Sequence, residues 1–330
     1  MENKISVIIP TYNSESTIKE CLDSVFNSNF KDFDVILISD KSTDGTVEIA
    51  KKYNCQIIEL SENKGPAYVR NLGAKNAKGD ILFFIDSDVI IKSDALSILN
   101  DEFNKKKNNV IQGIYSHKPN YNTVTQFQQS FLCYYTWSKK IKYTDTLTSA
   151  CFAIKKETFL HFKGFNTNIK SATCEDEEFG YNLIDNDNQI LINRNLIVEH
   201  RINLSLLKFI KRNFMMNFKT MKSFLRNKDY FKKKVNQNNY SSVLSSVPLL
   251  GLILLTLVIL PLYYSQTMII IFLFLNIIFF ILNLNFFYFV FIEKGLLKAI
   301  GIILTCYLNY FLIMIGASCA FISYIFGKKY

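Results

Sequence analysis

The C-terminal part of this 330-residue chain most constrains its fold, because residues 243–326 are almost continuously apolar. Within it, Val243–Tyr264, Met268–Ile292 and Ala299–Phe326 contain no Asp, Glu, Lys or Arg. A helix needs about 20 apolar residues to cross a bilayer, and each of the three segments is long enough. We therefore expect a membrane domain at 241–330 with about three transmembrane helices. Buried helices of a soluble protein are a poor alternative at these lengths.

A basic segment precedes the apolar region. Residues 201–234 contain eleven Lys or Arg and one acid, so this segment carries the whole formal net charge of +10. Such a segment is typical of the cytoplasmic side of a membrane with anionic lipids, and no nucleic-acid-binding motif accompanies it. Apolar residues also recur every three to four positions from Leu206 to Leu225. We expect basic amphipathic interfacial helices at 201–240. A surface helix packed on the soluble domain is the alternative.

Several features bear on location. The seven cysteines are scattered without a CxxC pair, which favours reduced thiols in a cytosolic domain. The apolar run near the N-terminus is too short for the apolar core of a signal peptide. We expect a multi-pass protein of the cytoplasmic (inner) membrane with its catalytic domain in the cytosol. Lys294 and Lys298 fit a cytosolic loop, whereas Lys328 and Lys329 do not, so the number of spans stays open.

The first 200 residues alternate between strand and helix patterns. Short apolar runs alternate with segments of helical spacing, which predicts βαβ units, an α/β fold and a mainly parallel sheet. Further strands are expected near 110–115 and 149–154, and a helix near Cys174. The first four predicted strands are 5–10, 34–39, 55–60 and 80–86, and the helices between them are 14–28, 43–53 and 65–77.

Two carboxylates interrupt the apolar run "FFIDSDVII" at Asp86 and Asp88. A buried carboxylate is costly unless something pairs with it. The pair comes at the carboxyl end of the fourth strand, where ligands gather in parallel sheets. If the backbone stays extended, both side chains face one ligand. Hard oxygen donors suit Mg²⁺ or Mn²⁺, so we expect a divalent metal here. D-x-D alone is a weak signal, and its position makes it informative.

Four motifs occur in an informative order: "SVIIPTYNSESTIKECLDSV", "ISDKSTDGT", "NKGPAYVRNLGAKNAKGDILFFIDSD" and "GFNTNIKSATCEDEEFGYNL". Together they resemble the family 2 glycosyltransferases over residues 5 to about 200. The resemblance implies a GT-A fold, that is, a Rossmann-like nucleotide-diphospho-sugar transferase domain at 1–200, with a nucleotide-sugar donor.

The resemblance also implies roles for individual residues. Asp40 receives a hydrogen bond from the base, Arg70 lies near the nucleotide and diphosphate, and Asp86 reaches the ribose or the metal. Asp88 is the direct metal ligand, Asp176 is the catalytic base, and His200 is a further metal or phosphate contact. Glu175 and Cys151 are expected on the acceptor side. The segment that lines the nucleotide pocket is Pro10, Thr11, Tyr12 and Asn13.

These residues have structural alternatives. Asp40 could cap the following turn, and Arg70 could form a surface ion pair. The acidic run Glu175–Glu178 could be a solvated first helical turn favoured by the helix dipole. His200 could be a structural histidine. For Asp86 and Asp88 together the functional interpretation is favoured.

The sequence departs from the family pattern at two neighbouring positions. Ser39 replaces one acid of the usual pair, and Lys41 replaces a small residue or Gly, so the base specificity is open. The Q-x-x-R-W motif of processive synthases does not occur after the acidic run, and the single tryptophan, Trp137, lies upstream. Processive polymer synthesis is therefore not expected.

These features predict an inverting, metal-dependent transfer of one sugar. The cation neutralises the diphosphate leaving group, and a carboxylate takes the proton of the attacking hydroxyl. We expect a lipid-linked or membrane-proximal glycan acceptor in cell-envelope synthesis, and anionic membrane lipids as partners. One alternative is a polyprenyl-phosphate sugar synthase, whose acceptor phosphate needs no base. Another is a catalytically silent membrane scaffold that retains the GT-A domain.

Overall fold

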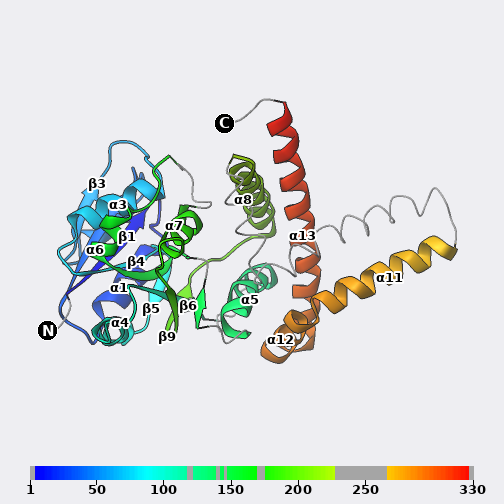
Figure 1. Cartoon of the computed structure of the whole chain (residues 1–330), viewed down its shortest axis with the longest axis horizontal. Helices are drawn as coiled ribbons and strands as arrows, with labels where there is room; N and C mark the ends of the chain where they lie inside the picture. The colour runs from blue at the N-terminus through cyan, green and yellow to red at the C-terminus, as the bar shows by residue number, and fades with distance from the viewer. Residues whose placement is uncertain are drawn as a thin grey trace. The chain divides into compact units, whose positions relative to one another are not determined.

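The computed structural model describes residues 4–116, 122–138, 142–144, 147–168, 175–226 and 266–326. The chain divides into two compact units (Figure 1). The first, here called the sheet unit, comprises Met1–Pro119 and Lys139–Ile202. The second, the helical unit, comprises Asn120–Ser138 and Asn203–Tyr330. The first predicted membrane segment, 243–264, and the lysines at 328 and 329 lie outside the described residues.

The sheet unit is built on a nine-stranded mixed sheet in the order β3-β2-β1-β4-β8-β6-β9-β5, with β7 paired to β9. The run β3-β2-β1-β4 is parallel throughout, whereas β8 is antiparallel to both β4 and β6. β9 is parallel to β6 and antiparallel to β5. The strands are β1 Ile5–Thr11, β2 Phe33–Ser39, β3 Gln56–Glu59, β4 Ile81–Ile85, β5 Val89–Ile91, β6 Val110–Tyr115, β7 Tyr143–Thr144, β8 Cys151–Lys155 and β9 Ile190–His200.

Helices cover both faces of this sheet (Figure 1). Successive strand residues point to opposite faces, so Val7 and Ile9 pack in one buried cluster and Ile8 packs in the other. The first cluster includes residues of α1, α2 and α4, and the second includes residues of α3, α6 and α7. The helices are α1 Ile18–Phe26, α2 Thr46–Ala50, α3 Pro66–Asn76, α4 Ala95–Asn104, α6 Lys156–His161 and α7 Glu175–Ile184.

The predicted α/β fold with a Rossmann-like sheet is confirmed. The first four predicted strands match β1 to β4, and the strands expected near 110–115 and 149–154 match β6 and β8. The parallel arrangement covers only part of the sheet, because β8 and β5 run antiparallel to their neighbours. The fourth strand is also shorter than predicted: it ends at Ile85, before Asp86.

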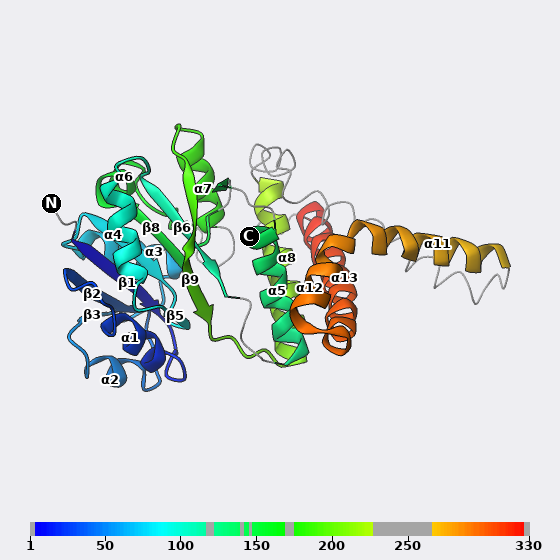
Figure 2. The ribbon, with the colours of Figure 1, turned by 90° about the horizontal axis from the view of Figure 1, so that it is seen from below.

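The helical unit consists of α5 Thr123–Ser138, α8 Leu206–Arg226, α11 Gln266–Leu282, α12 Leu284–Lys294 and α13 Leu296–Ile325 (Figure 2). α5 lies between β6 and β8 in the sequence, yet it belongs to this unit. Its Phe127 and Phe131 pack edge-on against Phe286 of α12. Nothing in the local sequence of α5 separates it from the sheet-forming segments around it.

α8 packs against α13. A Cβ at Gly316 would lie 2.9 Å from the carbonyl oxygen of Phe214, so only glycine allows this approach of the two backbones. Nδ2 of Asn213 donates to Oδ1 of Asn309 at 3.2 Å, which pairs two buried amides between the helices. Lys208, Lys211 and Leu207 are exposed. Of the segment predicted at 201–240, the structure describes a helix over Leu206–Arg226, and this helix packs against the apolar helix α13.

A bend separates α11 from α12. The two helices meet at Asn283, with an angle of 66° between Ile269–Leu282 and Leu284–Lys294. The hydroxyl of Tyr310 donates to Oδ1 of Asn283 at 3.0 Å and holds the bend to α13. By length and composition, α13 can cross a membrane, and the bent pair counts as a second span only if it acts as one. The described residues thus contain one or two candidate spans. Two of the three predicted spans, 268–292 and 299–326, fall within these residues.

Candidate active site

A pocket of about 600 Å³ opens at the carboxyl ends of β1 and β4. Parallel strands bring their following loops to one edge of a sheet, which is why residues far apart in the sequence meet here. Asp88 belongs to this lining, together with Ser87 between the two aspartates. The other predicted donor-site residues that line it are Pro10, Thr11, Tyr12, Asn13, Asp40, Arg70 and Asp86.

The loops after β1 and β2 are tied together. Oδ1 of Asn13 accepts the backbone N–H of Thr43 at 2.8 Å, and the Asn13 N–H donates to Oγ of Ser42 at 3.1 Å. Asn13 has a φ of 50°, a conformation that Asn tolerates better than most residues. Two residues on, the Glu15 carboxylate accepts the N–H of Gly45. The first two motifs therefore form one rim of the pocket.

Asp40 holds the loop before α3. Its two carboxylate oxygens accept the backbone N–H groups of Lys64 at 2.7 Å and Gly65 at 2.9 Å. The structural alternative in the sequence analysis, a cap on the following turn, is wrong, because these partners lie 24 and 25 residues further along the chain. Asp40 is buried but still contributes to the pocket lining.

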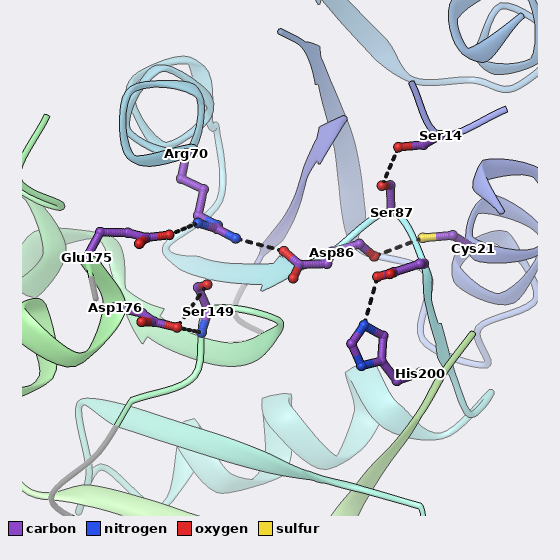
Figure 3. Close-up of polar contacts among 10 residues, drawn as sticks. Ser14, Cys21, Arg70, Asp86, Ser87, Ser149, Glu175, Asp176 and His200 are labelled. Carbon is purple, nitrogen blue, oxygen red and sulfur yellow. Dashed lines mark hydrogen bonds and ion pairs between the residues drawn. The ribbon is translucent and has the colours of Figure 1, made fainter. Parts of the chain in front are cut away.

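The D-S-D segment turns instead of staying extended. The Val89 N–H donates to the Asp86 carbonyl at 3.0 Å, which closes a tight turn between β4 and β5. The expectation that an extended strand aims both carboxylates the same way is therefore wrong. Two hydrogen bonds hold the turn. Oγ of Ser87 lies 2.7 Å from Oγ of Ser14, and the Cys21 thiol donates to the Asp86 carbonyl (Figure 3).

Arg70 joins two of the motifs (Figure 3). From α3 its NH2 contacts Oδ1 of Asp86 at 2.8 Å, and its NH1 contacts Oε1 of Glu175 at 3.2 Å. Burial alone lowers the pKa of a guanidinium, but the two carboxylates outweigh it, and the pKa of Arg70 is raised. Arg70 is therefore buried, not a surface ion-pair residue, and its single positive charge is shared between Asp86 and Glu175.

Asp88 takes a different partner. Its Oδ1 lies 3.1 Å from Nε2 of His200, the last residue of β9. Antiparallel pairing of Val89 with His200 brings the imidazole beside the turn. The ring is buried and stacks on Tyr115, with centroids 5.3 Å apart. Burial, and then the charge of Asp86, raise the pKa of the Tyr115 hydroxyl.

Asp176 lies in the first turn of α7. Its Oδ2 accepts both the backbone N–H of Ser149 at 3.0 Å and the Ser149 hydroxyl at 3.2 Å. Its Oδ1 accepts the N–H of Glu177 at 2.9 Å. Burial, reinforced by Glu175 and Glu177, raises the pKa of Asp176 to about 7. A carboxylate with such a pKa can accept a proton at neutral pH.

The two residues predicted on the acceptor side, Glu175 and Cys151, are both buried. The Glu175 carboxylate is buried and paired with Arg70, so it also differs from a solvated helix turn. Cys151 is a buried residue of β8 that pairs with Ile85, and burial raises the pKa of its thiol. A Cβ at Gly113 would lie 2.3 Å from Sγ of Cys151, so the thiol packs against the backbone of β6.

Sequence reasoning missed three residues of this site: Ser87, Tyr115 and Ser149. Ser87 stands inside the D-x-D motif, so its position was a usable signal. Tyr115 and Ser149 lie in segments without a local motif. The pairing of β6 with β9 brings Tyr115 to His200, and Ser149 meets Asp176 from the segment before β8. Within the described residues, no group of three or more His, Cys, Asp or Glu is arranged to hold a metal. The pair nearest to that description is Asp88 with His200.

Comparison with known proteins identifies the class. Residues 6–163 match the model of glycosyl transferase family 2. A poly(ribitol-phosphate) beta-glucosyltransferase of Bacillus spizizenii is 45% identical over 101 residues, which cover 28% of this chain and 16% of the relative. The poly(ribitol-phosphate) beta-N-acetylglucosaminyltransferase TarS of Staphylococcus aureus is 41% identical over 100 residues, which cover 28% of this chain and 18% of the relative. The chain therefore matches less than a fifth of these relatives' length.

One solved structure resembles almost the whole chain. The mannosyltransferase PcManGT from Pyrobaculum calidifontis, in complex with GDP-Man and Mn²⁺, aligns with 99% of this chain and 88% of its own, with a TM-score of 0.59. At 14% identity this likeness concerns the fold alone. Residues 6–163 therefore form a domain of the glycosyl transferase family 2 type, as the four sequence motifs predicted, and the fold is that of the GT-A glycosyltransferases.

Proposed function

We propose that this protein transfers one sugar from a nucleotide-sugar donor to a hydroxyl of a lipid-linked or membrane-proximal glycan, with inversion at the anomeric carbon. The observation that carries the proposal is the bridge made by Arg70. It joins the D-S-D turn of the pocket to the helix that bears Asp176, a carboxylate with a pKa of about 7. A donor pocket and a proton acceptor are thereby built into one charge network.

The donor's nucleotide would occupy the pocket at the ends of β1 and β4. Its volume of about 600 Å³ falls within the usual range for small-ligand sites. The loops tied by Asn13 and the loop held by Asp40 form its walls. Tyr12 is 56% exposed at this rim, which leaves its ring accessible for stacking on a base. These contacts support the roles expected for residues 10–13, whereas Asp40 has both oxygens engaged by backbone amides.

The residues present fit a divalent cation. A carboxylate oxygen of Asp88 and the imidazole of His200 lie 3.1 Å apart, and two neighbouring ligands of an octahedral ion are separated by about 3 Å. Two protein ligands also suit Mg²⁺ or Mn²⁺, which often complete their coordination with substrate phosphates and water. We assign Asp88 and His200 to the ion, which would supply positive charge to the diphosphate leaving group. The carboxylate of Asp86, which Arg70 holds in place, would lie near the ion and add negative charge beside it.

Asp176 would act as the general base. The acceptor oxygen attacks the anomeric carbon, the bond from that carbon to the diphosphate oxygen breaks, and the hydroxyl proton passes to the Asp176 carboxylate. Direct displacement needs one base and no covalent intermediate, and it inverts the anomeric carbon. At pH 7 a group with a pKa of about 7 is about half ionised. A phosphate acceptor would need no such group, which is why we favour a hydroxyl.

The helical unit supports attachment to a membrane. α13 is long and apolar enough to span a bilayer, and Leu297 and Leu304 expose their side chains on it. Lys208 and Lys211 are exposed on α8 and would attract anionic lipid headgroups. We infer a cytoplasmic-membrane protein with a cytosolic active site. The two curated relatives act on poly(ribitol-phosphate) by their names, which supports an anionic cell-envelope glycan as the acceptor.

The test is a donor screen with membranes that contain the full chain. UDP-, GDP- and dTDP-sugars are supplied with Mn²⁺ or Mg²⁺, and both donor hydrolysis and sugar transfer are measured. We expect turnover with one donor, loss of turnover on EDTA, and loss in Asp88→Asn. Exposed Asp94→Asn, outside the pocket, is the matched control.

Two other outcomes would redirect the proposal. Transfer to a polyprenyl phosphate, but to no hydroxyl acceptor, would identify a lipid-phosphate sugar synthase. Neither turnover nor nucleotide binding with any donor would favour a silent membrane scaffold and would contradict the proposed function.

A further inference from the structure

Ser149, in the segment that leads into β8, contacts the proposed base directly. It gives two donors to one oxygen of Asp176: its backbone N–H at 3.0 Å and its hydroxyl at 3.2 Å (Figure 3). Ser149 itself is buried, with 5% of its surface exposed. Hydrogen bonds to charged groups are among the stronger ones in proteins, so this buried hydroxyl stabilises the Asp176 carboxylate.

A second layer holds Ser149 in place. The buried amide of Gln112, on β6, accepts the backbone N–H of Thr148 at 2.8 Å and donates to the carbonyl of Cys151 at 2.7 Å. These two bonds clamp the chain on both sides of Ser149. On the other side, a Cβ at Gly180 of α7 would lie 2.9 Å from Cβ of Leu147, so helix and segment are in close contact. The donors of Ser149 are thus rigidly placed relative to α7.

We propose that Ser149 is a positioning residue for the Asp176 carboxylate, and that Gln112 acts through it by clamping residues 148–151. The inference rests on the proposed function of Asp176 as the base. Oδ2 is held by Ser149 and Oδ1 by the backbone of Glu177, so the carboxylate cannot rotate freely. A base held in one orientation meets the acceptor hydroxyl without a further loss of freedom on binding.

The backbone N–H of Ser149 opposes the charges around Asp176, and the hydroxyl is a second donor to the same oxygen. Burial disfavours the ionised form of Asp176 most, followed by Glu175 and Glu177 on α7, whereas Arg70 on α3 favours that form. Tyr115 on β6 feels the charge of Asp176 as well. A donor to the ionised form lowers the pKa of a carboxyl group. The two donors of Ser149 therefore keep Asp176 available as a base near neutral pH.

The test compares Ser149→Ala with Ser149→Thr, which keeps the hydroxyl, in the full chain. The readout is kcat/KM for sugar transfer from pH 5.5 to 9, together with the donor KM. For Ser149→Ala we expect the acid limb to move up by about 0.5–1 pH unit. At pH 6 kcat/KM then falls about three- to tenfold, with less than about a twofold change at pH 9 and an unchanged donor KM. Ser149→Thr restores the profile.

Controls separate this effect from a loss of structure. Ser28→Ala removes another buried serine hydroxyl, outside the pocket, and should leave the profile unchanged. Gln112→Leu should shift the acid limb in the same direction as Ser149→Ala. A pH-independent loss in Ser149→Ala, or an unaltered profile, would overturn the inference. Absence of turnover in the unsubstituted protein would instead count against the proposed function.

Discussion

The two halves of the sheet contribute different things to the site. The parallel run β3-β2-β1-β4 supplies the pocket walls, Asp40 and the D-S-D turn, all from loops that directly follow strands. The other half consists of β8, β6, β9 and β5. Its contributions are His200, Tyr115 and Ser149, all of which lie between residues 110 and 200. The first half lines the pocket, and the second half adds side chains that contact Asp88 and Asp176.

Under the proposed function, this difference separates donor binding from chemistry. In the parallel half, each element is a local strand–loop–helix unit whose loop ends at the pocket. In the other half, antiparallel pairing places the end of β9 against β5, so His200 reaches a turn more than a hundred residues away in sequence. Arg70 then links the halves through Asp86 and Glu175.

The largest expected effect comes from removing this link. Arg70→Ala leaves two carboxylates without their counter-charge, and breaking a buried ion pair costs about 3–5 kcal/mol. We expect the free energy of unfolding of the sheet unit to fall by about this amount, measured by denaturant titration. The matched control is Lys51→Ala, which removes an exposed ion pair with Glu48 and should change little. A stable Arg70→Ala variant with normal turnover would contradict the claim that Arg70 links the two halves of the sheet.

His200→Asn tests the contribution of the antiparallel half to the metal. Loss of the imidazole beside Asp88 should raise the Mn²⁺ concentration for half-maximal activity about 10- to 100-fold. Titration of activity with Mn²⁺ measures this, and excess metal should restore most of the rate. His161→Asn, an exposed histidine on α6, is the matched control. An unchanged Mn²⁺ requirement would leave His200 a structural residue only.

The pH dependence sharpens the role of the base. Only ionised Asp176 accepts a proton, so kcat/KM should fall about tenfold per pH unit below a pKa of about 7 and level off above it. The stability contribution has the opposite sign. Because the folded pKa lies above the unfolded value of about 3.9, that contribution is largest below about pH 4. It is then lost as the pH rises towards 7. A flat rate profile from pH 5 to 8 would contradict the assignment.

The smallest effect is expected in the helical unit. Gly316→Ala introduces a Cβ 2.9 Å from the Phe214 carbonyl oxygen and 3.1 Å from Cβ of Asn217, which forces α8 and α13 apart. Overpacking of this kind costs about 1–3 kcal/mol. Thermal unfolding in detergent, with the exposed Ser318→Ala as control, measures it. If Gly316→Ala were as stable as the control, the close approach of the two helices would be unsupported.

The parallel half could be predicted from the sequence because its signals are local. Apolar runs bounded by Gly, Asp and Asn marked β1 to β4, and Pro66 marked the start of α3. The geometry of Asp86 and Asp88 could not, because the end of β4 depends on which residues pair with β8. Five β4 residues pair with β8, and the last pair is Ile85 with Cys151.

The antiparallel half was harder for a physical reason. The partner of Arg70, Glu175, lies 105 residues away, and the Gln112 amide acts through a loop that carries no motif. The acidic motif marked Asp176 as a candidate base, but its raised pKa depends on burial, which the sequence does not express. α5 was also missed as part of the helical unit, because its contacts with α12 and α13 are long-range.

The most direct test of this account is to measure donor binding and sugar transfer side by side in Asp176→Asn. The substitution removes the base but leaves the parallel half intact. We predict nucleotide-sugar affinity within about twofold of the unsubstituted protein and a kcat about 10²- to 10⁴-fold lower. Full transfer to a hydroxyl acceptor by Asp176→Asn, or loss of donor binding together with transfer, would contradict the division of the site between the two halves of the sheet.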